Sequence, residues 1–371
     1  MKRYWLCALA LILVGGLLWA ADSAKKVTDP TDKSKQIAVV LVQGGLGDKG
    51  YNDDAKKGLD SLRKELGMES VMVEPADLAQ GETYLRQLGD EGYGAIVSLE
   101  YGIKDAMYKV AAEYPKTIFV IFGKYAANKG LKLSDNVVEI ELRLAEHSYL
   151  AGIVASFLAT DGNEIVKGVG ARKGANIGMI CAIESLGFYR YHDGFMQGAR
   201  DYNPECNVYT DYNGGFTDTQ NVKTIAENMI KNKNCDVVFT CCGTAGLGGL
   251  QAARINKAFA IGVDSNQDYL EPGTVVTSAM RRTDLSLIAI GQQLLDGTLK
   301  GSAFVCNVEN RMLDITDMST IAKYVTNPKK FAELKSIIEK ARKDIASGKI
   351  KVIDAANGVR YEDYIKQQKS K

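Results

Sequence analysis

The sequence predicts an α/β protein in which each of two lobes contains a parallel sheet. Short apolar runs alternate along the chain with amphipathic stretches of about 10–15 residues, an order typical of parallel strands joined by right-handed helical crossovers. The 37 glycines far outnumber the 6 prolines, and this composition favours tight turns between strands and helices over disorder. With 371 residues the chain exceeds what one such sheet requires, so we expect two domains.

The first series of elements begins at residue 37. The run from Ile37 to Val42 is too short and too rich in β-branched residues for a helix, so we predict a buried strand. A glycine-rich loop at 44–50 and a helix at 53–65 follow it. The same unit recurs, with strands at 69–74, 95–99, 117–122 and 136–143 and helices at 80–90, 104–113 and 145–159.

A second series begins after the polar stretch 160–175. It has strands at 176–181, 207–212, 236–240 and 258–263 and helices at 189–202, 218–232 and 245–256. Three late segments come after this series is complete, and we expect them to return to the first lobe: strand 274–279, helix 283–297 and strand 303–311. A terminal amphipathic helix is predicted from Pro328 to Gly348.

This order predicts how the chain divides between the lobes. We assign residues 37–144 plus 279–310 to lobe 1 and residues 145–278 plus 311–371 to lobe 2. Several crossings between two lobes form a hinge, and a hinge leaves a cleft.

The N-terminal segment is expected to lie outside both lobes. Residues 1–21 combine a short basic start with an apolar stretch from Trp5 to Ala21, a pattern typical of a secretory signal peptide. Residues 22–36 are polar and rich in lysine, and we predict a flexible leader. We therefore expect an exported protein, periplasmic or otherwise extracytoplasmic, that is membrane-anchored if the signal is not cleaved.

Charge and composition exclude several classes of function. The chain has 46 basic and 45 acidic residues, so it lacks the positive excess that nucleic-acid binding requires. Its two histidines lie far apart in the sequence, which excludes a His-rich metal site, and we expect neither a metal nor a cofactor. Cys181, Cys235 and Cys241 border apolar runs, which favours small buried hydrophobic side chains over zinc ligands. The disulfide state of the six cysteines after the signal stays open.

Loops that follow strands are the candidate ligand-binding site, because open parallel sheets bind ligands at the carboxyl ends of their strands. The loop 43–53 lacks the motifs of phosphate-binding and dinucleotide-binding loops. In one interpretation, Tyr51 offers a flat stacking face while Asp48 and Asn52 offer hydrogen bonds to a ligand. In the other, Asn52 caps the next helix and Tyr51 is its hydrophobic staple.

Two further aromatic residues lie in loops after strands. Tyr101 precedes a glycine at the tip of strand 95–99, and Phe216 follows paired glycines after strand 207–212. An exposed loop has no need of a core phenylalanine, so Phe216 is a candidate ligand contact. Burial under a neighbouring loop is the alternative.

Polar groups complete the candidate site. The glycine-rich loop from Gly243 to Gly246 offers backbone N–H groups. Asp264 ends one strand, and Arg281 lies close to the expected crossing between lobes. An acid and an arginine in these positions suit a neutral, hydroxyl-rich ligand.

The sequence predicts no catalytic residues. It contains neither a Gly-x-Ser-x-Gly elbow nor a His-Glu-x-x-His motif. His147 is expected to be partly exposed early in a helix. His192 lies in an aromatic and basic segment, where contact with a ligand is the less favoured interpretation.

Several of these motifs, in the same order, resemble the basic membrane protein family, which is typified by the purine-nucleoside-binding lipoproteins of ABC importers. The similarity covers most of residues 37–353. The segments that carry it are Gly45-Leu-Gly-Asp48-Lys49-Gly50-Tyr51-Asn52, Tyr149-Leu150-Ala151-Gly152, Gly194-Phe195-Met-Gln-Gly198-Ala199, Gly214-Gly215-Phe216-Thr217-Asp218, Gly262-Val263-Asp264-Ser265-Asn266-Gln267 and Ile345-Ala-Ser-Gly348-Lys-Ile350-Lys-Val352.

The resemblance implies a type I periplasmic-binding-protein fold with two Rossmann-like lobes and a ligand cleft at the hinge. It implies that Tyr51 and Phe216 sandwich a planar heterocycle. Asp264 would accept hydrogen bonds from sugar hydroxyls, and Arg281, where the family commonly has lysine, would contact the same hydroxyls. It further implies a shell completed by Asp48, Asn52 and the loop Gly243–Gly246.

Two departures from the family pattern bear on the ligand. Purine receptors of the family usually carry an aspartate just after the first strand, where this chain has Val42 or Gln43. The family also often ends the fourth strand with an aspartate, where this chain has Phe122-Gly123. Losing a carboxylate that reads the base edge changes selectivity strongly, and a more apolar pocket could accept a larger ring.

The resemblance therefore implies a monomeric solute receptor for a membrane ABC permease. A purine nucleoside is the first ligand to consider and riboflavin, bound by some family relatives, is the second. A nucleoside-cleaving enzyme and a surface adhesin with the same fold are the rival classes. Turnover would identify the enzyme, and a lack of affinity for small molecules would identify the adhesin.

Overall fold

The computed structural model describes residues 26–369 apart from residues 28, 76, 125–133, 163–164, 171 and 173. The predicted signal peptide, residues 1–21, lies outside the described residues. In the described part of the chain, no helix is both long and apolar enough to cross a membrane.

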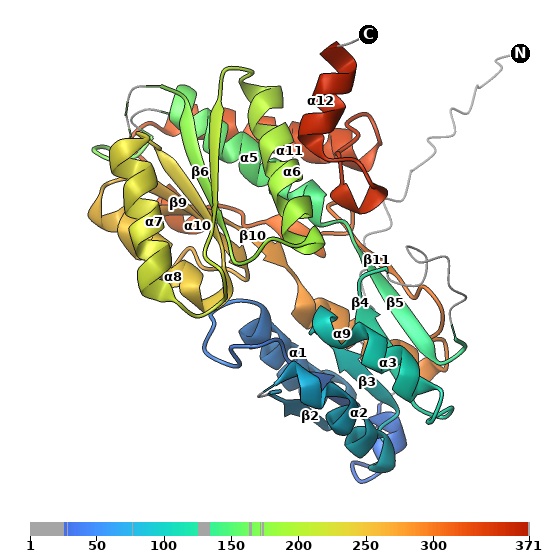
Figure 1. Ribbon diagram of the computed structural model, residues 1–371. Coiled ribbons are helices and arrows are strands. Elements are labelled where there is room, and N and C mark those ends of the chain that lie inside the picture. Colours follow the sequence, from blue (N-terminus) through green and yellow to red (C-terminus); the bar gives the residue numbers. More distant parts are fainter. Residues whose placement is uncertain are drawn as a thin grey trace, which may run out of the picture.

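The first lobe is built on a sheet in which all strands are parallel (Figure 1). Helices α1 (Tyr51–Leu66) and α9 (Thr283–Asp296) cover one face, and α2 (Gly81–Asp90) and α3 (Lys104–Ala111) cover the other. The strands lie in the order β11-β5-β4-β3-β1-β2, with bounds β1 (Ile37–Val40), β2 (Ser70–Val73), β3 (Ala95–Ser98), β4 (Ile118–Phe122), β5 (Val137–Leu142) and β11 (Val305–Cys306).

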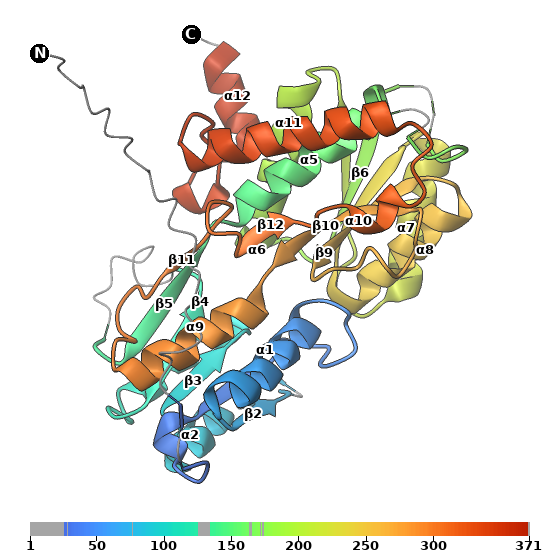
Figure 2. The same cartoon turned by 180° about the vertical axis from the view of Figure 1, so that it is seen from behind.

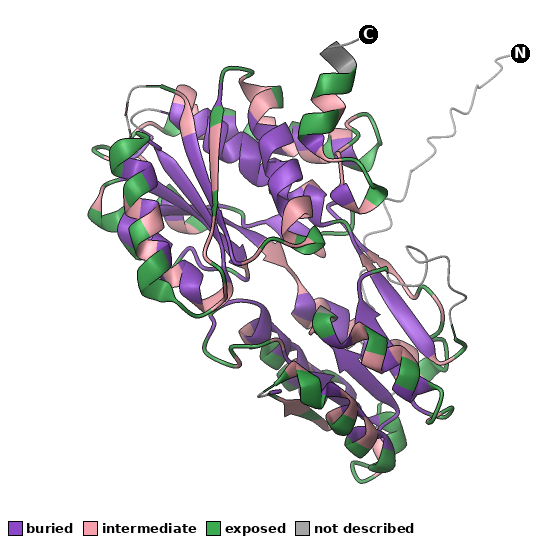
Figure 3. Cartoon of the chain, in the orientation of Figure 1, coloured by how far each residue is buried: buried purple, intermediate pink, exposed green. Residues whose placement is uncertain are grey.

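Alternation of side chains in β1 shows why this sheet is covered on both faces. Ile37 and Val39 belong to the apolar cluster that includes α1 and α9, whereas Ala38 and Val40 belong to the cluster of α2 and α3. All four residues are buried, and the sheet is buried along most of its length (Figure 3). A run without polar alternation is therefore the expected sequence of such a strand.

The second lobe repeats the plan. Helices α7 (Thr219–Asn232) and α8 (Gly246–Ile255) cover one face, and α5 (Leu144–Thr160) and α6 (Leu186–Tyr202) cover the other. The helix α11 (Pro328–Ala346) packs across α5 (Figure 2), and α12 (Tyr361–Lys369) lies against α6. The strands lie in the order β12-β10-β9-β8-β6-β7, with bounds β6 (Asn176–Cys181), β7 (Asn207–Tyr212), β8 (Val237–Cys241), β9 (Phe259–Asp264), β10 (Val275–Arg281) and β12 (Leu313–Ile315).

Two expectations about the late segments are wrong. The strand predicted at 274–279 does not return to the first lobe, because β10 pairs with β9 in the second sheet. The strand predicted at 303–311 is two short strands: β11 pairs with β5 of the first sheet, and β12 pairs antiparallel with β10 of the second. Within the described residues the chain thus passes between the lobes three times, after β5, after β10 and between β11 and β12.

Part of the predicted leader lies on the first lobe. The Val27 N–H donates to the Leu66 carbonyl (2.8 Å), and the Lys33 carbonyl accepts from the Gly94 N–H (2.9 Å). These backbone hydrogen bonds attach Val27 and Lys33, both in segment 22–36, to the first lobe.

The cysteines are part of the core. Each of the six in the described residues is buried and free, and burial raises the pKa of Cys181 and Cys235 to about 12. The prediction of small buried hydrophobic side chains is confirmed, and these two thiols stay protonated at neutral pH.

Glycines bring α5 and α6 into very close contact. A Cβ added at Gly152 would lie 2.1 Å from the Phe195 carbonyl oxygen, and one at Gly198 would lie 2.0 Å from the Tyr149 carbonyl oxygen. The two backbones therefore touch where the Tyr149–Gly152 and Gly194–Ala199 motifs cross. Larger residues would force these helices, which carry one wall of the cleft, apart.

Gly198→Ala should therefore lower the free energy of unfolding by at least about 1–3 kcal/mol, because the added methyl overlaps backbone atoms that cannot move independently. Gly187→Ala is the matched control on the same helix, since its nearest contact would be the Ser185 Oγ at 3.9 Å. It should be neutral or slightly stabilising. Urea unfolding of both variants checks this, and equal stabilities would contradict the close contact.

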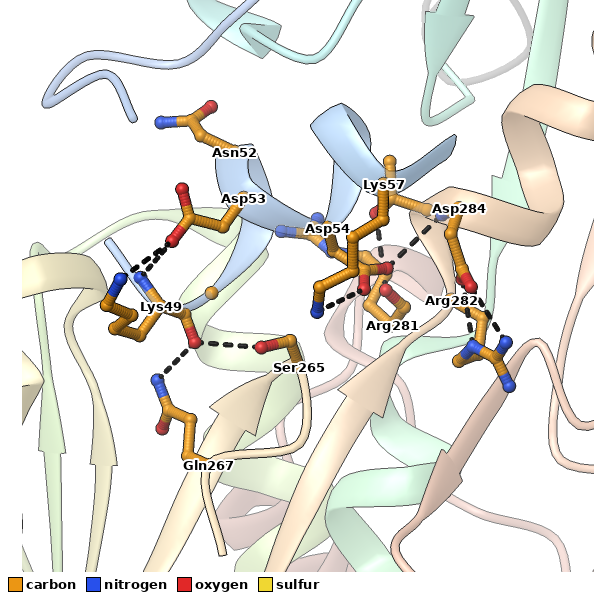
Figure 4. A network of polar contacts seen from close by, with 12 residues as sticks. Lys49, Asn52, Asp53, Asp54, Lys57, Ser265, Gln267, Arg281, Arg282 and Asp284 are labelled. Atoms are coloured by element: carbon orange, nitrogen blue, oxygen red, sulfur yellow. Dashed lines mark hydrogen bonds and ion pairs between the residues drawn. The ribbon is translucent and has the colours of Figure 1, made fainter. Parts of the chain in front are cut away.

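Two carboxyl groups meet where α1 packs on α9. The Asp54 carboxylate accepts from the Asp284 N–H (3.2 Å) and pairs with the exposed Lys57 (3.4 Å; Figure 4). Burial and then the nearby Asp284 carboxylate raise the pKa of Asp54 to about 6. Burial would also raise the pKa of Asp284, but two hydrogen bonds from Arg282 (2.8 Å each) hold it below its usual value.

Asp54→Asn should raise the free energy of unfolding at pH 7–8 by about 1–2 kcal/mol. The pKa of Asp54 is about 6 in the folded wild type and about 4 in the unfolded chain. The folded state therefore holds more protons between these values, and this group makes stability fall as pH rises through that window. In urea unfolding from pH 4 to 8, the free energy of unfolding of the variant should not show this decrease.

Asp60→Asn is the control on the same helix, because the Asp60 side chain is 66% exposed. Its pH profile should follow that of the wild type. Parallel profiles for Asp54→Asn and the wild type would refute the raised pKa.

Candidate ligand-binding site

A cavity of about 900 Å³ lies between the two lobes. Both lobes line it, largely with residues that follow the carboxyl ends of strands, as expected for open parallel sheets. Its size suits a ligand of a few hundred daltons enclosed on most sides. Of the predicted site residues, those that line the cavity are Asp48, Tyr51, Phe216, Gly243, Asp264 and Arg281.

Asp48 organises the loop that leads into α1. One carboxylate oxygen accepts from the N–H groups of Gly50 (2.8 Å) and Asp53 (3.1 Å), and the other accepts from that of Asn52 (2.9 Å). Burial raises the pKa of Asp48, and these three backbone hydrogen bonds oppose the rise. The capping role that the sequence suggested for Asn52 thus belongs to Asp48.

The guanidinium of Arg281 lies over the ring of Tyr51 beside the cavity. The Tyr51 side chain is 5% exposed, and the Arg281 Cζ lies 3.3 Å from the centre of its ring. Burial raises the pKa of the Tyr51 hydroxyl to about 12, so the phenol is neutral at physiological pH. The stacking face predicted for Tyr51 is therefore occupied on one side by a guanidinium.

Asp264 ends β9 in a strained backbone conformation. Its φ is +64°, in the left-handed region that residues other than glycine rarely adopt. An Arg281 Nη lies 3.1 Å from its carboxylate, and the Tyr191 hydroxyl donates to the same oxygen at 3.4 Å. The turn thus presents a carboxylate, already paired with one cation, to the cavity.

Phe216 belongs to an aromatic group in the second lobe. Its ring centre lies 5.9 Å from that of Phe188, which in turn lies 6.4 Å from that of Tyr191. The Phe216 carbonyl accepts from the Ala245 N–H (2.8 Å) of the next loop, where Gly243 has φ +56°. Phe216 is half-buried: it lines the cavity and also packs against the apolar core of the second lobe.

Two predicted site residues do not line the cavity. The Asn52 amide is used within its own loop, where Oδ1 accepts from the Val42 N–H (3.1 Å) and Nδ2 donates to the carbonyls of Val42 and Gly45. Gly246 is buried at the start of α8 against Thr240. Asn52 therefore holds the loop that carries Asp48 and Tyr51. For Tyr101 the structure describes the backbone alone, which begins a short 3-10 turn. The residues on either side of Tyr101, Glu100 and Gly102, line the cavity.

Helix α6 provides one wall of the cavity that was not predicted from the sequence. Phe188, Arg190 and Tyr191 of this helix line the cavity. His192, the residue of this segment considered for a ligand contact, instead lies 2.8 Å from the Asp193 carboxylate. Residues at positions i and i+3 of a helix share a face, so the pair Phe188 and Tyr191 was the available signal.

The C-terminal segment forms a further part of the wall that the sequence analysis missed. Residues between Ile345 and Asn357 line the cavity and are held by α6. Arg190 makes two hydrogen bonds to the Asp354 carboxylate (2.7 and 2.8 Å), and Gln197 bonds both the Lys351 carbonyl and the Ile353 N–H. No local pattern predicts these contacts, since the partners lie more than 150 positions apart.

His147 lies deeper than expected. It is 0% exposed rather than partly exposed, and its ring packs edge-on against Tyr191 with ring centres 5.0 Å apart. Burial and then the positive charges of Arg281 and Arg190 lower its pKa to about 3, so the imidazole is neutral at physiological pH. His147 supports Tyr191 from behind the cavity wall.

The cavity therefore combines aromatic surface with several charges that are paired with one another. Asp264 pairs with Arg281, Asp354 with Arg190, and Glu141 with Lys124 and Arg143. Among the described residues, no group of three or more His, Cys, Asp or Glu side chains could hold a metal ion. This arrangement suits a neutral ligand with a flat ring and hydrogen-bonding groups.

Solved structures show the same architecture. A solute-binding protein of an ABC transporter system from Aeropyrum pernix K1 superposes with a TM-score of 0.74 at 24% identity, over 86% of this chain and 93% of that one. A periplasmic solute-binding protein from Actinobacillus succinogenes 130z with bound D-allose gives 0.60 at 14% identity, over 78% and 99%. The fold is the type I periplasmic-binding-protein fold that the sequence resemblance implied.

Sequence relatives show the family. The ABC transporter nucleoside-binding protein BmpA of Lactococcus lactis is 25% identical over 95% of this chain and 99% of its own length. Basic membrane protein A of Borreliella burgdorferi is 24% identical over 88% and 90%. The family model for PnrA-like substrate-binding proteins of ABC transporters matches residues 35–353. The chain therefore belongs to the Bmp family of ABC transporter substrate-binding proteins.

Proposed function

We propose that this chain is the extracytoplasmic receptor of an ABC importer and binds a purine nucleoside between its lobes. The observation that carries the proposal is the Asp264–Arg281 pair beside Tyr51 on the wall of the inter-lobe cavity. A carboxylate and a guanidinium offer an acceptor and donors to sugar hydroxyls. Aromatic rings next to them offer stacking faces to a base. The nucleoside-binding relative from Lactococcus lactis supports this choice.

Binding would bring the two lobes together around the ligand. The first lobe contributes Tyr51 and the second contributes Phe216 and Asp264, so a ligand that touches all three joins the lobes. The closed form would then dock on the membrane permease as a monomer. The site has a binding role in this proposal and performs no chemical step.

Riboflavin is the second candidate ligand, and the first-lobe wall favours it. Val42, Gln43, Phe122 and Gly123 line the cavity. They occupy the two positions where the family resemblance implies aspartate, after the first strand in purine receptors and at the end of the fourth strand in many family members. A wall without those carboxylates suits a larger and less polar ring. A flavin shares with a nucleoside the combination of flat ring and hydroxyl-bearing chain.

The decisive experiment identifies the ligand that purifies with the protein. The chain without residues 1–21 is expressed, purified without refolding and denatured, and the released molecule is analysed by absorbance and mass. A purine nucleoside is expected, and a yellow flavin would establish the second candidate. If nothing is released, titration with both classes follows. Affinity for neither class, or conversion of nucleoside to free base, would overturn the proposal.

Two substitutions should separate the ring contact from the hydroxyl contact. Phe216→Ala should weaken binding of nucleoside and free base alike by about 1–3 kcal/mol, because both carry the ring. Asp264→Asn should weaken the nucleoside by about 1.5–3 kcal/mol more than the free base, because only the nucleoside brings hydroxyls and any loosening of Arg281 affects both ligands alike. Calorimetric titration measures both affinities.

The exposed Asp60→Asn variant is the control for loss of a carboxylate, and melting curves confirm that each variant is folded. Equal loss of base and nucleoside in Asp264→Asn would show that Asp264 does not bind the sugar. Unchanged affinities in Phe216→Ala would remove Phe216 from the ring contact.

A further inference from the structure

Tyr51 and Arg281 belong to different lobes, yet their side chains are in direct contact. Tyr51 is the first residue of α1 in the first lobe, and Arg281 is the last residue of β10 in the second. The Arg281 Cζ lies over the Tyr51 ring, 3.3 Å from its centre. At this distance the guanidinium covers one ring face, so a ligand can stack only on the opposite face.

Packing, rather than hydrogen bonding, fixes the Tyr51 ring. Its buried hydroxyl has no hydrogen-bond partner among the described residues. Arg281 is itself fixed by Asp264 at 3.1 Å, and its side chain is 17% exposed. Burial alone would lower the pKa of Arg281, but Tyr51, Asp264 and Tyr191 together raise it, so the guanidinium stays charged against the ring.

The backbone next to Tyr51 is tied to the second lobe as well. The Lys49 carbonyl accepts two hydrogen bonds from the loop that follows Asp264, one from the Ser265 hydroxyl (2.8 Å) and one from the Gln267 amide (3.0 Å; Figure 4). The Gln267 amide is held in turn, since its oxygen accepts from the Val263 N–H (2.9 Å). Lys49 has φ +51°, an uncommon conformation for a residue with a side chain.

We propose that Arg281 is a positioning residue for Tyr51: from the second lobe it holds the ring of a first-lobe residue in the orientation that stacks on the ligand. The stacking on a ligand rests on the proposed function, whereas the positioning of the ring does not. A lysine keeps the positive charge for Asp264 but lacks the planar group that covers the ring.

The positioning is tested without any ligand by labelling the protein with 3-fluorotyrosine. The fluorine signal of Tyr51 is assigned by its loss in Tyr51→Phe. In Arg281→Lys this signal should shift and the ring should flip faster, while the melting temperature stays near that of the wild type. Arg282→Lys, next in sequence and paired with Asp284, should leave the Tyr51 signal unchanged. An identical signal and flip rate in Arg281→Lys and the wild type would overturn the proposal.

Affinity then separates positioning from direct contact with hydroxyls. If Arg281 acts through Tyr51, Arg281→Lys should lower the affinity for the free purine base, which has no hydroxyls to contact Arg281, by about tenfold. This loss should largely disappear in a Tyr51→Ala background, because the stack is already absent. A loss confined to the nucleoside, or an equal loss in both backgrounds, would show that Arg281 contacts hydroxyls and does not position Tyr51.

The two parts of the test fail independently. If neither nucleoside nor base binds the wild type, the proposed function fails, and the fluorine signal still decides whether Arg281 positions Tyr51. If ligand binds but the fluorine signal does not respond to Arg281→Lys, the positioning role fails and the function stands.

Discussion

When helices cover both faces of a sheet, only the ends of its strands stay accessible to a ligand, and this constraint shapes the whole molecule. In both sheets, helices run back over the faces and lead the chain to the start of the next strand. The carboxyl ends of the parallel strands therefore lie along one edge. The two lobes face each other across these edges. Loops spread from residue 43 to residue 281 therefore meet in one cavity.

The charges on the cavity wall follow from the cost of removing an ion from water. A buried charge is tolerated when a partner and hydrogen bonds compensate it. Arg281 has Asp264 and the Tyr51 ring, and Arg190 has Asp354. A neutral ligand can enter such a site without leaving either charge unpaired. The site thus offers donors and acceptors while its local charge stays balanced.

Arg190 and Arg281, which line the cavity, also lie where the chain crosses between the lobes. Arg190 donates to the Leu142 carbonyl at the end of β5, where the chain first crosses, and holds the C-terminal segment through Asp354. Arg281 ends β10, where the chain crosses again. Movement of the lobes must therefore turn about groups that also line the cavity, so opening and ligand contact are physically linked.

Local sequence determined the α/β class, most strands and helices, and the loops that carry Tyr51, Phe216 and Asp264. Burial and turn geometry leave a periodic pattern that can be read within a few residues. Tertiary structure decided what those residues do. It assigned the helix cap to Asp48 instead of Asn52 and split the predicted strand 303–311 between two sheets. It also laid Arg281 on Tyr51 and brought Asp354 to Arg190. Such pairs join distant parts of the chain, and their geometry exists only once the sheets have packed, so no local pattern encodes them.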